Sequence, residues 1–134
     1  MRLTFNEQEA TVTTVADLRL WWDALRQQQS TELWLDATEE GPSLVMLVNG
    51  QYALLMYLPD RDGNAGFTSR NPHYAGPPDA QTECLLSNGQ LDMYPTAWTL
   101  PLSEAIEACE YFITTHGDRS PAIAWHDDAL HDEA

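Results

Sequence analysis

The sequence predicts a single α+β domain, spanning residues 1–134, in which a mainly antiparallel sheet meander is flanked by two helices. Three observations favour this fold class. Apolar residues recur at helical spacing in two segments, one near each end of the chain. Between these segments lie short apolar and β-branched runs, and two Asn-Gly pairs separate neighbouring runs as hairpin turns do. The length of 134 residues suits one domain, and no repeat or linker divides it.

The first predicted helix runs from Val15 to about Gln28. Thr14 is a typical N-cap residue, and Asp17 follows at the position of the second partner in a capping box. The residues at helical spacing, which we expect to be buried, are Val15, Leu18, Trp21, Trp22 and Leu25. The tryptophan pair could form a ligand platform, but core packing is the preferred interpretation. The β-branched segment Thr11–Thr14 could close a short first strand before this helix.

Three strands are predicted next. Glu32–Asp36 alternates between apolar and polar residues, whereas Ser43–Val48 and Tyr52–Leu58 are almost continuously apolar. Asn49-Gly50 predicts a hairpin in which both turn residues take positive φ, and Gly41-Pro42 predicts the preceding turn. Continuous apolar runs are typical of strands that are covered on both faces. One helical layer covers one face, so the other should contact a second helix, a curled sheet or a partner.

The second half of the chain begins with a polar stretch, residues 59–78. Within it, Gly66–Ser69 could be a short strand, and Asn71–Asp79 predicts an exposed loop. Glu83–Leu86 and Gln90–Tyr94 then predict a second hairpin about Asn88-Gly89.

The second predicted helix starts at Pro101 and stops at Gly117. Its apolar stripe consists of Leu102, Ile106, Cys109, Phe112 and Ile113. Pro121–Trp125 predicts a last short strand, and the acidic residues 126–134 are expected to form a flexible tail.

Charge is the most unusual feature of the composition. Six Lys and Arg face 21 Asp and Glu, which gives a formal net charge of −15 at pH 7. Such a surface repels nucleic acid and anionic membranes, and it attracts basic proteins and accelerates their association. We therefore expect a protein partner and neither nucleic acid nor a membrane, although solubility alone could also explain the charge.

Cysteine usage and hydropathy predict a soluble, cytoplasmic protein. Cys84 and Cys109 have no neighbours at zinc-ligand spacing, which favours a reducing compartment. Residues 1–7 lack the apolar core of a signal peptide. The longest apolar stretch, Leu44–Leu58, is interrupted by Asn49-Gly50-Gln51, whereas a membrane-spanning helix needs about 20 apolar residues.

One segment partly matches a calcium-binding loop. Asp60, Asp62 and Asn64 occupy its first, third and fifth positions, but Ala65 replaces the glycine at position six and Asn71 the glutamate at position twelve. A solvated turn is therefore the preferred interpretation.

Other candidates for chemistry are equally incomplete. Cys84 could act as a nucleophile with His73 or His116 as its base, but both cysteines lie in patterns where thiols behave as small hydrophobic residues. A second set, at the C-terminus, could bind a metal adventitiously: His126, Asp127, Asp128, His131, Asp132 and Glu133. Nucleotide-binding, serine hydrolase and zinc protease or deaminase motifs are absent. We predict no catalytic residue, no cofactor and no metal, so a binding role fits better than an enzymatic one.

Three groups of residues carry a resemblance to a known family. The first consists of Leu33-Trp34-Leu35, Gly41-Pro42-Ser43-Leu44, Asn49-Gly50 and Tyr57. The second consists of Gly66–Ser69 and Asn88–Asp92. The third and strongest consists of Leu102–Ala108, Phe112, Thr114–Gly117, Pro121 and Trp125. In this order, over residues 10–126, the chain resembles the first-described family of immunity proteins from bacterial polymorphic toxin systems, which includes inhibitors of double-stranded-DNA cytidine deaminase toxins.

The resemblance implies an α+β fold, no catalysis, and tight binding to a cognate toxin encoded beside the protein. It also implies a toxin directed at nucleic acid, often a zinc-dependent deaminase. The matching residues are mostly turn glycines, core residues and a helix, so they define the fold and do not locate the binding face.

Charge and resemblance together suggest which residues bind the partner. A toxin that acts on nucleic acid needs a basic cleft for phosphates, which carboxylates of an inhibitor could occupy. The acidic candidates on loops and hairpin ends are Glu39, Glu40, Asp60, Asp62, Asp79, Glu83 and Asp92. The aromatic candidates beside them are Phe67, Tyr74 and Tyr94, because aromatic side chains are common binding hot spots. For any single residue, a solvated turn or a rim aromatic is the alternative.

The sequence thus predicts a protein that binds and inhibits a toxin, a nucleic-acid-directed cytidine deaminase, by blocking its active site. The alternative is an acidic interaction or regulatory domain with an unrelated basic partner. A small enzyme that uses Cys84 or the histidines is a third option.

Overall fold

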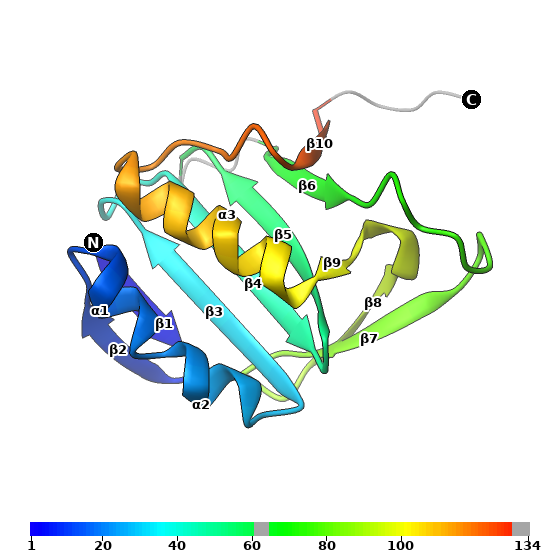
Figure 1. Cartoon of the computed structure of the whole chain (residues 1–134), viewed down its shortest axis with the longest axis horizontal. Helices are drawn as coiled ribbons and strands as arrows, with labels where there is room; N and C mark the ends of the chain where they lie inside the picture. The colour runs from blue at the N-terminus through cyan, green and yellow to red at the C-terminus, as the bar shows by residue number, and fades with distance from the viewer. Residues whose placement is uncertain (61–64, 130–134) are drawn as a thin grey trace.

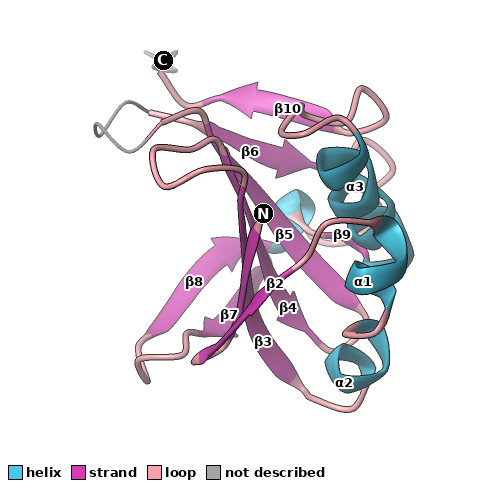
Figure 2. Cartoon of the chain, turned by 90° about the vertical axis from the view of Figure 1, so that its left-hand side faces the viewer, coloured by secondary structure: helices cyan, strands magenta, loops and turns pink. Residues whose placement is uncertain are grey.

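The computed structural model describes residues 1–60 and 65–129 (Figure 1). The chain forms three layers: helices cover one face of a large antiparallel sheet, and a separate two-stranded sheet lies on the other face (Figure 2). Over the described residues, the large sheet has eight strands in the order β10-β6-β5-β4-β3-β1-β2, with β9 paired to β5. The predicted α+β class with a mainly antiparallel sheet is confirmed.

The N-terminal residues form a hairpin that the sequence analysis did not anticipate. Its strands are β1 (Arg2–Phe5) and β2 (Gln8–Thr11), and Asn6 turns the chain with φ of 53°. Asn tolerates this left-handed conformation better than most residues. Thr11–Thr14 was predicted to close a first strand; β2 does end at Thr11, but residues 12–14 do not belong to it. Gln8–Thr11 carries little of the β-branched and aromatic pattern that would have indicated a strand.

The helix predicted over 15–28 is divided into α1 (Val15–Arg19) and α2 (Trp22–Arg26). The predicted capping box is confirmed, since Thr14 accepts from the Asp17 backbone and Asp17 accepts from the Thr14 backbone. The Trp21 N–H donates to the carbonyl of Leu18, three residues earlier, at 3.0 Å. This 3₁₀-type hydrogen bond interrupts the α-helical pattern. The interruption leaves the Trp21 ring 5.4 Å from Phe5.

The three central strands are confirmed as β3 (Ser30–Asp36), β4 (Ser43–Asn49) and β5 (Tyr52–Leu58). The hairpin between β4 and β5 is also confirmed, but Asn49 pairs with Tyr52, so its two loop residues are Gly50 and Gln51. Gly50 has φ of 61°, whereas the positive φ predicted for Asn49 is wrong. Glycine at the first loop position is the pattern of a type II′ turn.

The strands predicted in the second half of the chain appear in the predicted order, whereas the short strand at Leu100–Pro101 was not predicted. The strands of this half are β6 (Phe67–Arg70), β7 (Gln81–Leu85), β8 (Leu91–Pro95), β9 (Leu100–Pro101) and β10 (Ala124–Asp127), with a 3₁₀ turn η1 (Thr96–Trp98). In the β7–β8 hairpin, Gly89 supplies the positive φ, 88°. The last strand extends beyond its predicted end, and His126 and Asp127 pair with β6. A flexible tail from residue 126 is therefore wrong for these two residues, and residues 130–134 lie outside the described part of the chain.

The long helix α3 (Leu102–Thr114) is capped at its start by Pro101 and buries the predicted stripe. At its C-terminus, the Gly117 N–H donates to the Phe112 carbonyl and the His116 N–H to the Ile113 carbonyl. This is a Schellman motif, in which His116 takes the left-handed conformation with φ of 60°. The helix was predicted to stop at Gly117, but the left-handed residue that ends it is His116, one position earlier. Among the residues that the structure describes, no helix has the length and apolar character to span a membrane.

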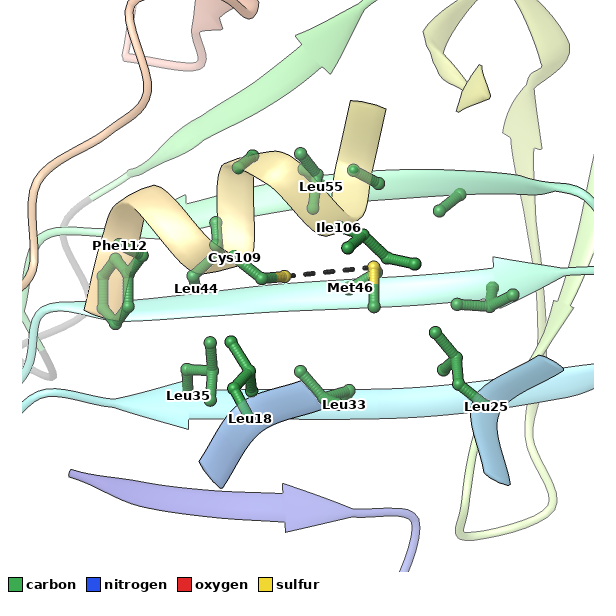
Figure 3. Close-up of a cluster of buried hydrophobic side chains, with 14 of the residues drawn as sticks. Leu18, Leu25, Leu33, Leu35, Leu44, Met46, Leu55, Ile106, Cys109 and Phe112 are labelled. Atoms are coloured by element: carbon green, nitrogen blue, oxygen red, sulfur yellow. Dashed lines mark hydrogen bonds between the residues drawn. The ribbon is translucent and has the colours of Figure 1, made fainter. Parts of the chain in front are cut away.

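The main core lies between the helices and the large sheet (Figure 3). Its central members are fully or almost fully buried: Leu18, Leu25, Leu33, Leu35, Leu44, Met46, Leu55, Ile106, Cys109 and Phe112. A second core lies on the opposite face and contains Val45, Leu47, Leu54 and Cys84. The β7–β8 hairpin provides this second cover, so the continuously apolar runs of β4 and β5 are explained by a second sheet.

Candidate protein-binding surface

The predicted binding residues fall into two groups. The sheet-end group lies at one end of the large sheet: Glu39 and Glu40 in the β3–β4 turn, Asp60 just after β5, and Phe67 at the start of β6. The hairpin group consists of Tyr74 and Asp79 in the loop before β7, Glu83 on β7, and Asp92 and Tyr94 on β8. Asp62 and Asn64, the third and fifth positions of the calcium-loop pattern, fall outside the described residues.

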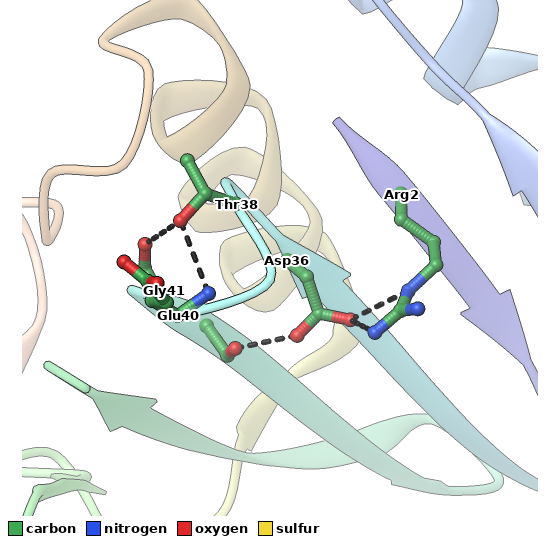
Figure 4. A network of polar contacts seen from close by, with 6 residues as sticks. Arg2, Asp36, Thr38, Glu40 and Gly41 are labelled. Atoms are coloured by element: carbon green, nitrogen blue, oxygen red, sulfur yellow. Dashed lines mark hydrogen bonds and ion pairs between the residues drawn. The ribbon is translucent and has the colours of Figure 1, made fainter. Parts of the chain in front are cut away.

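Two hydrogen bonds shape the turn that carries Glu39 and Glu40 (Figure 4). The Thr38 hydroxyl donates to the Gly41 carbonyl at 2.7 Å and accepts from the Glu40 N–H at 3.2 Å. Gly41 has φ of 101°, and a Cβ there would lie 3.1 Å from the Asp60 Cα. Glycine therefore lets this turn approach the segment after β5, and both glutamates remain exposed.

Below this turn, one carboxylate is withdrawn from the surface. Asp36 is 3% exposed; it accepts from the Arg2 Nε and Nη2 atoms, each at 3.2 Å, and from the Ser43 hydroxyl (Figure 4). A buried carboxylate needs such partners. Asp36 therefore stabilises the pairing of β1, β3 and β4 and is not available to a partner.

Phe67 is also partly covered. The Arg119 guanidinium lies 3.6 Å from the centre of the Phe67 ring, a cation–π contact, and Tyr57 meets the same ring edge-on at 6.2 Å. The Tyr57 hydroxyl donates to the Gly117 carbonyl at 2.6 Å. The aromatic member of the sheet-end group is therefore integrated into the fold around the end of α3.

The hairpin group is divided by the alternation of β7 and β8. Cys84 is buried against the large sheet, and Tyr94 packs on the same core with its ring 6.5 Å from Trp98. Because side chains alternate along a strand and paired residues share a face, Asp92 lies on this inner side, opposite Cys84. Glu83 lies on the outer side, directly opposite Met93.

The outer side of the hairpin also carries residues that the sequence analysis did not select. Leu85 and Leu91 pair across the strands, and Met93 follows two residues after Leu91. We call the set of Glu83, Leu85, Leu91 and Met93 the outer hairpin face. The second Asn-Gly pair indicated the hairpin, but the inner residues Cys84 and Leu86 are as apolar as the outer ones. The sequence therefore gave no signal for which side faces solvent.

The two groups lie at opposite ends of β3 and β4. At the hairpin end, the Asn49 side-chain amide donates to the Glu83 carbonyl, and Ser87 donates to Glu32. The turn with Glu39 and Glu40 follows the other end of β3. Seven strand residues separate the ends, which corresponds to roughly 20 Å. The structure thus assembles the predicted residues into two sites and not one.

The segment that carries the hairpin group contains no arginine or lysine. All six cationic residues are arginines, and no arginine or lysine occurs between Arg70 and Arg119. Arg19 forms a two-point ion pair with Glu110, with both N–O distances 3.0 Å, and the Arg70 guanidinium lies 3.8 Å from the centre of the Trp98 ring. Together with Arg2 on Asp36, these contacts hold arginines within the fold. Because no arginine or lysine occurs in this part of the chain, the loop and hairpin from 71 to 95 carry acidic side chains without neighbouring arginine or lysine residues in the sequence.

The thiols are not arranged for nucleophilic chemistry. Burial raises the pKa of Cys84, and the nearby Asp92 raises it further. Burial raises the pKa of Cys109 to about 12. Both thiols are therefore protonated at neutral pH, whereas a nucleophilic cysteine requires the thiolate. Within residues 1–60 and 65–129, no three His, Cys, Asp or Glu residues gather as a metal site.

The family described as immunity protein Imm1 matches residues 6–127. The chain belongs to this family. The match covers every helix and every strand after β1, so it includes both the sheet-end group and the hairpin group. The protein is thus an immunity protein, whose partner is a toxin, and the predicted family is confirmed. A comparison with curated proteins finds no match.

Proposed function

We propose that this immunity protein acts by binding alone: it occupies the active site of its cognate toxin and excludes the toxin's substrate. We further propose that the toxin is a nucleic-acid-directed cytidine deaminase. The resemblance to inhibitors of double-stranded-DNA cytidine deaminase toxins supports this choice. Inhibition of this kind needs no catalytic residue, cofactor or metal in the immunity protein.

The strongly acidic character of the protein is the observation that carries the proposal. The net charge is −15, and contacts within the fold hold Arg2, Arg19, Arg70 and Arg119. A toxin that acts on nucleic acid requires cationic groups along its substrate cleft. Carboxylates on the inhibitor complement the same cations, so inhibitor and substrate compete for one site. An acidic regulatory domain with an unrelated partner would share the charge but would not explain the family membership.

The proposed contact residues are those of the two groups. They are Glu39, Glu40, Asp60 and Phe67 at the sheet end and Tyr74, Asp79, Glu83, Asp92 and Tyr94 at the hairpin. Asp62, which lies outside the described residues, is a further proposed contact. Exposure favours Glu39, Glu40, Asp79 and Glu83 as direct contacts. Asp92 already accepts hydrogen bonds from Gln90 and Tyr94, so its role would be electrostatic.

Association kinetics with the purified toxin test the charge mechanism. We expect the association rate to fall about tenfold or more as salt is raised from low to physiological concentration, because the Debye length shrinks to about 8 Å. The dissociation rate should change less, because short-range contacts hold the formed complex. A substrate DNA strand should compete with the immunity protein. A salt-independent association rate, or a ternary complex with DNA, would refute this mechanism.

Two sets of charge-neutralising variants identify the group that makes contact. Glu39→Gln/Glu40→Gln alters the sheet end, and Asp79→Asn/Glu83→Gln alters the hairpin. Glu104→Gln/Glu107→Gln, on the exposed face of α3, is the matched control with the same change in net charge. All three pairs should slow association slightly, but only a pair within the interface should also accelerate dissociation.

Stoichiometry distinguishes binding from catalysis. One equivalent of the immunity protein should be needed for full inhibition, and mass spectrometry should find the released toxin unaltered. Inhibition by trace amounts, or a covalent change in the toxin, would show that the immunity protein is an enzyme.

A further inference from the structure

We propose that the outer hairpin face is the apolar centre of the toxin-binding surface, and that it contacts a toxin surface where apolar side chains surround or adjoin a basic group. The assignment rests on the proposed function and deepens it, because it selects the hairpin over the sheet end and adds residues that charge alone does not indicate.

The outer hairpin face concentrates exposed apolar side chains. Leu85, Leu91 and Met93 are 49%, 52% and 51% exposed. They account for three of the six large hydrophobic residues that are exposed among the described residues. Leu85 and Leu91 are directly opposed across the strands, and Met93 is on the same side one step along β8, so the three form one patch. Isolated exposed leucines are ordinary, but a patch of this kind is typical of a binding surface.

The hairpin that presents this patch is held in place from its other side. Cys84, 2% exposed, packs with Val45 and Leu47 of β4. At the turn, the Ser87 N–H and hydroxyl donate to Glu32 at 3.1 and 2.9 Å. An isolated two-stranded hairpin is marginally stable, so these contacts explain why the patch keeps a defined shape. A preordered surface loses little conformational freedom on binding.

Charge decides which partner fits the patch. Glu83 lies beside Met93 on the outer face, and the chain has no arginine or lysine from position 71 to 118. A second copy of this chain would oppose one acidic surface with another, and each copy carries −15. An anionic membrane would be repelled for the same reason. A protein that places apolar side chains on the leucines and an arginine or lysine on Glu83 satisfies both features, and a nucleic-acid-directed toxin offers such cations.

The test compares one chemical change at two positions. Leu91→Glu places a carboxylate within the patch, whereas Leu20→Glu makes the same change at a leucine that is 80% exposed between α1 and α2, in the helical layer on the other face of the large sheet. Circular dichroism and thermal unfolding verify that both variants fold. We expect Leu91→Glu to weaken toxin binding at least tenfold in calorimetry and Leu20→Glu to change it less than twofold.

A second measurement does not depend on any variant. Hydrogen exchange of the unaltered complex should show added protection at backbone amides of 81–95, and Glu83→Gln should reduce the salt dependence of the affinity. Unchanged affinity in Leu91→Glu, or no added protection in 81–95, would refute the hairpin assignment alone. Formation of a dimer that Leu91→Glu dissolves without weakening toxin binding would also refute it. If the unaltered protein does not bind the toxin, the proposed function fails as well.

Discussion

Truncation of Phe112 should remove a large part of the stability of the fold. Phe112 is 1% exposed in the core between α3 and the sheet, and its ring meets Tyr57 edge-on at 6.2 Å (Figure 3). Deleting a buried phenylalanine ring costs about 3–5 kcal/mol through lost transfer free energy and the cavity left behind. The aromatic pair accounts for about 0.5–1.5 kcal/mol of this cost. We therefore expect Phe112→Ala to lower the free energy of unfolding by about 4 kcal/mol.

Urea unfolding followed by circular dichroism measures this effect. With a typical slope of about 1.5 kcal/mol per molar urea, the midpoint should fall by about 2–3 M. Tyr111→Ala is the matched control, because Tyr111 is the preceding residue of the same helix and is exposed. Tyr111→Ala should lower the free energy of unfolding by less than about 1 kcal/mol. Equal effects of the two variants, or a loss below about 1 kcal/mol for Phe112→Ala, would refute the assigned orientation of α3.

Three further predictions follow from the polar and sulfur contacts. Hydrogen bonds from Arg19 of α1 hold the pKa of Glu110 below its usual value. The ionised Glu110 therefore stabilises the fold at pH values above its usual pKa, and this stabilisation is lost as the pH falls through the lower pKa of the folded state. Glu110→Gln should therefore show a smaller decrease in melting temperature than the unaltered protein between about pH 6 and 3; an identical decrease would contradict this. Asp36→Asn should cost about 1–3 kcal/mol in thermal unfolding, since it weakens the bonds of a buried carboxylate; a neutral result would show that the ion pair does not stabilise the sheet. Cys84 and Cys109 should react with a thiol reagent only after unfolding, because both are buried and their pKa values are raised; rapid labelling of the native protein would contradict their placement.

Local signals in the sequence were sufficient for most elements. The Thr14–Asp17 capping box, the two Asn-Gly pairs and the stripe of α3 each involve residues close together in the chain, so their geometry depends on short-range sterics and hydrogen bonds. Where those signals were weak, the prediction was wrong or absent. The β1–β2 hairpin has no strong strand pattern and is held by β3. The Glu32 N–H of β3 donates to the side-chain oxygen of Asn6, 26 positions away in the chain. At the division between α1 and α2, Trp21 packs against Phe5, which is distant in the sequence.

The candidate site was less accessible to sequence reasoning, for a related reason. Charge identified exposed carboxylates such as Glu39 and Glu83. The net charge also includes Asp36, which is buried and bonded to an arginine 34 positions away. Aromatic residues were selected without knowledge of their neighbours, and Phe67 proved to lie under Arg119.

The sequence by itself determined the fold class, the family and the acidic character of this protein, because each follows from composition or from patterns along the chain. Only the tertiary structure decided that the β7–β8 hairpin covers the second face of the large sheet. That packing buries Cys84 and leaves Leu85, Leu91 and Met93 exposed, although all four are apolar residues of one hairpin. The local sequence of this hairpin does not distinguish its two faces. Which face is buried is decided by contacts with Val45, Leu47 and Leu54, more than twenty-five residues earlier in the chain.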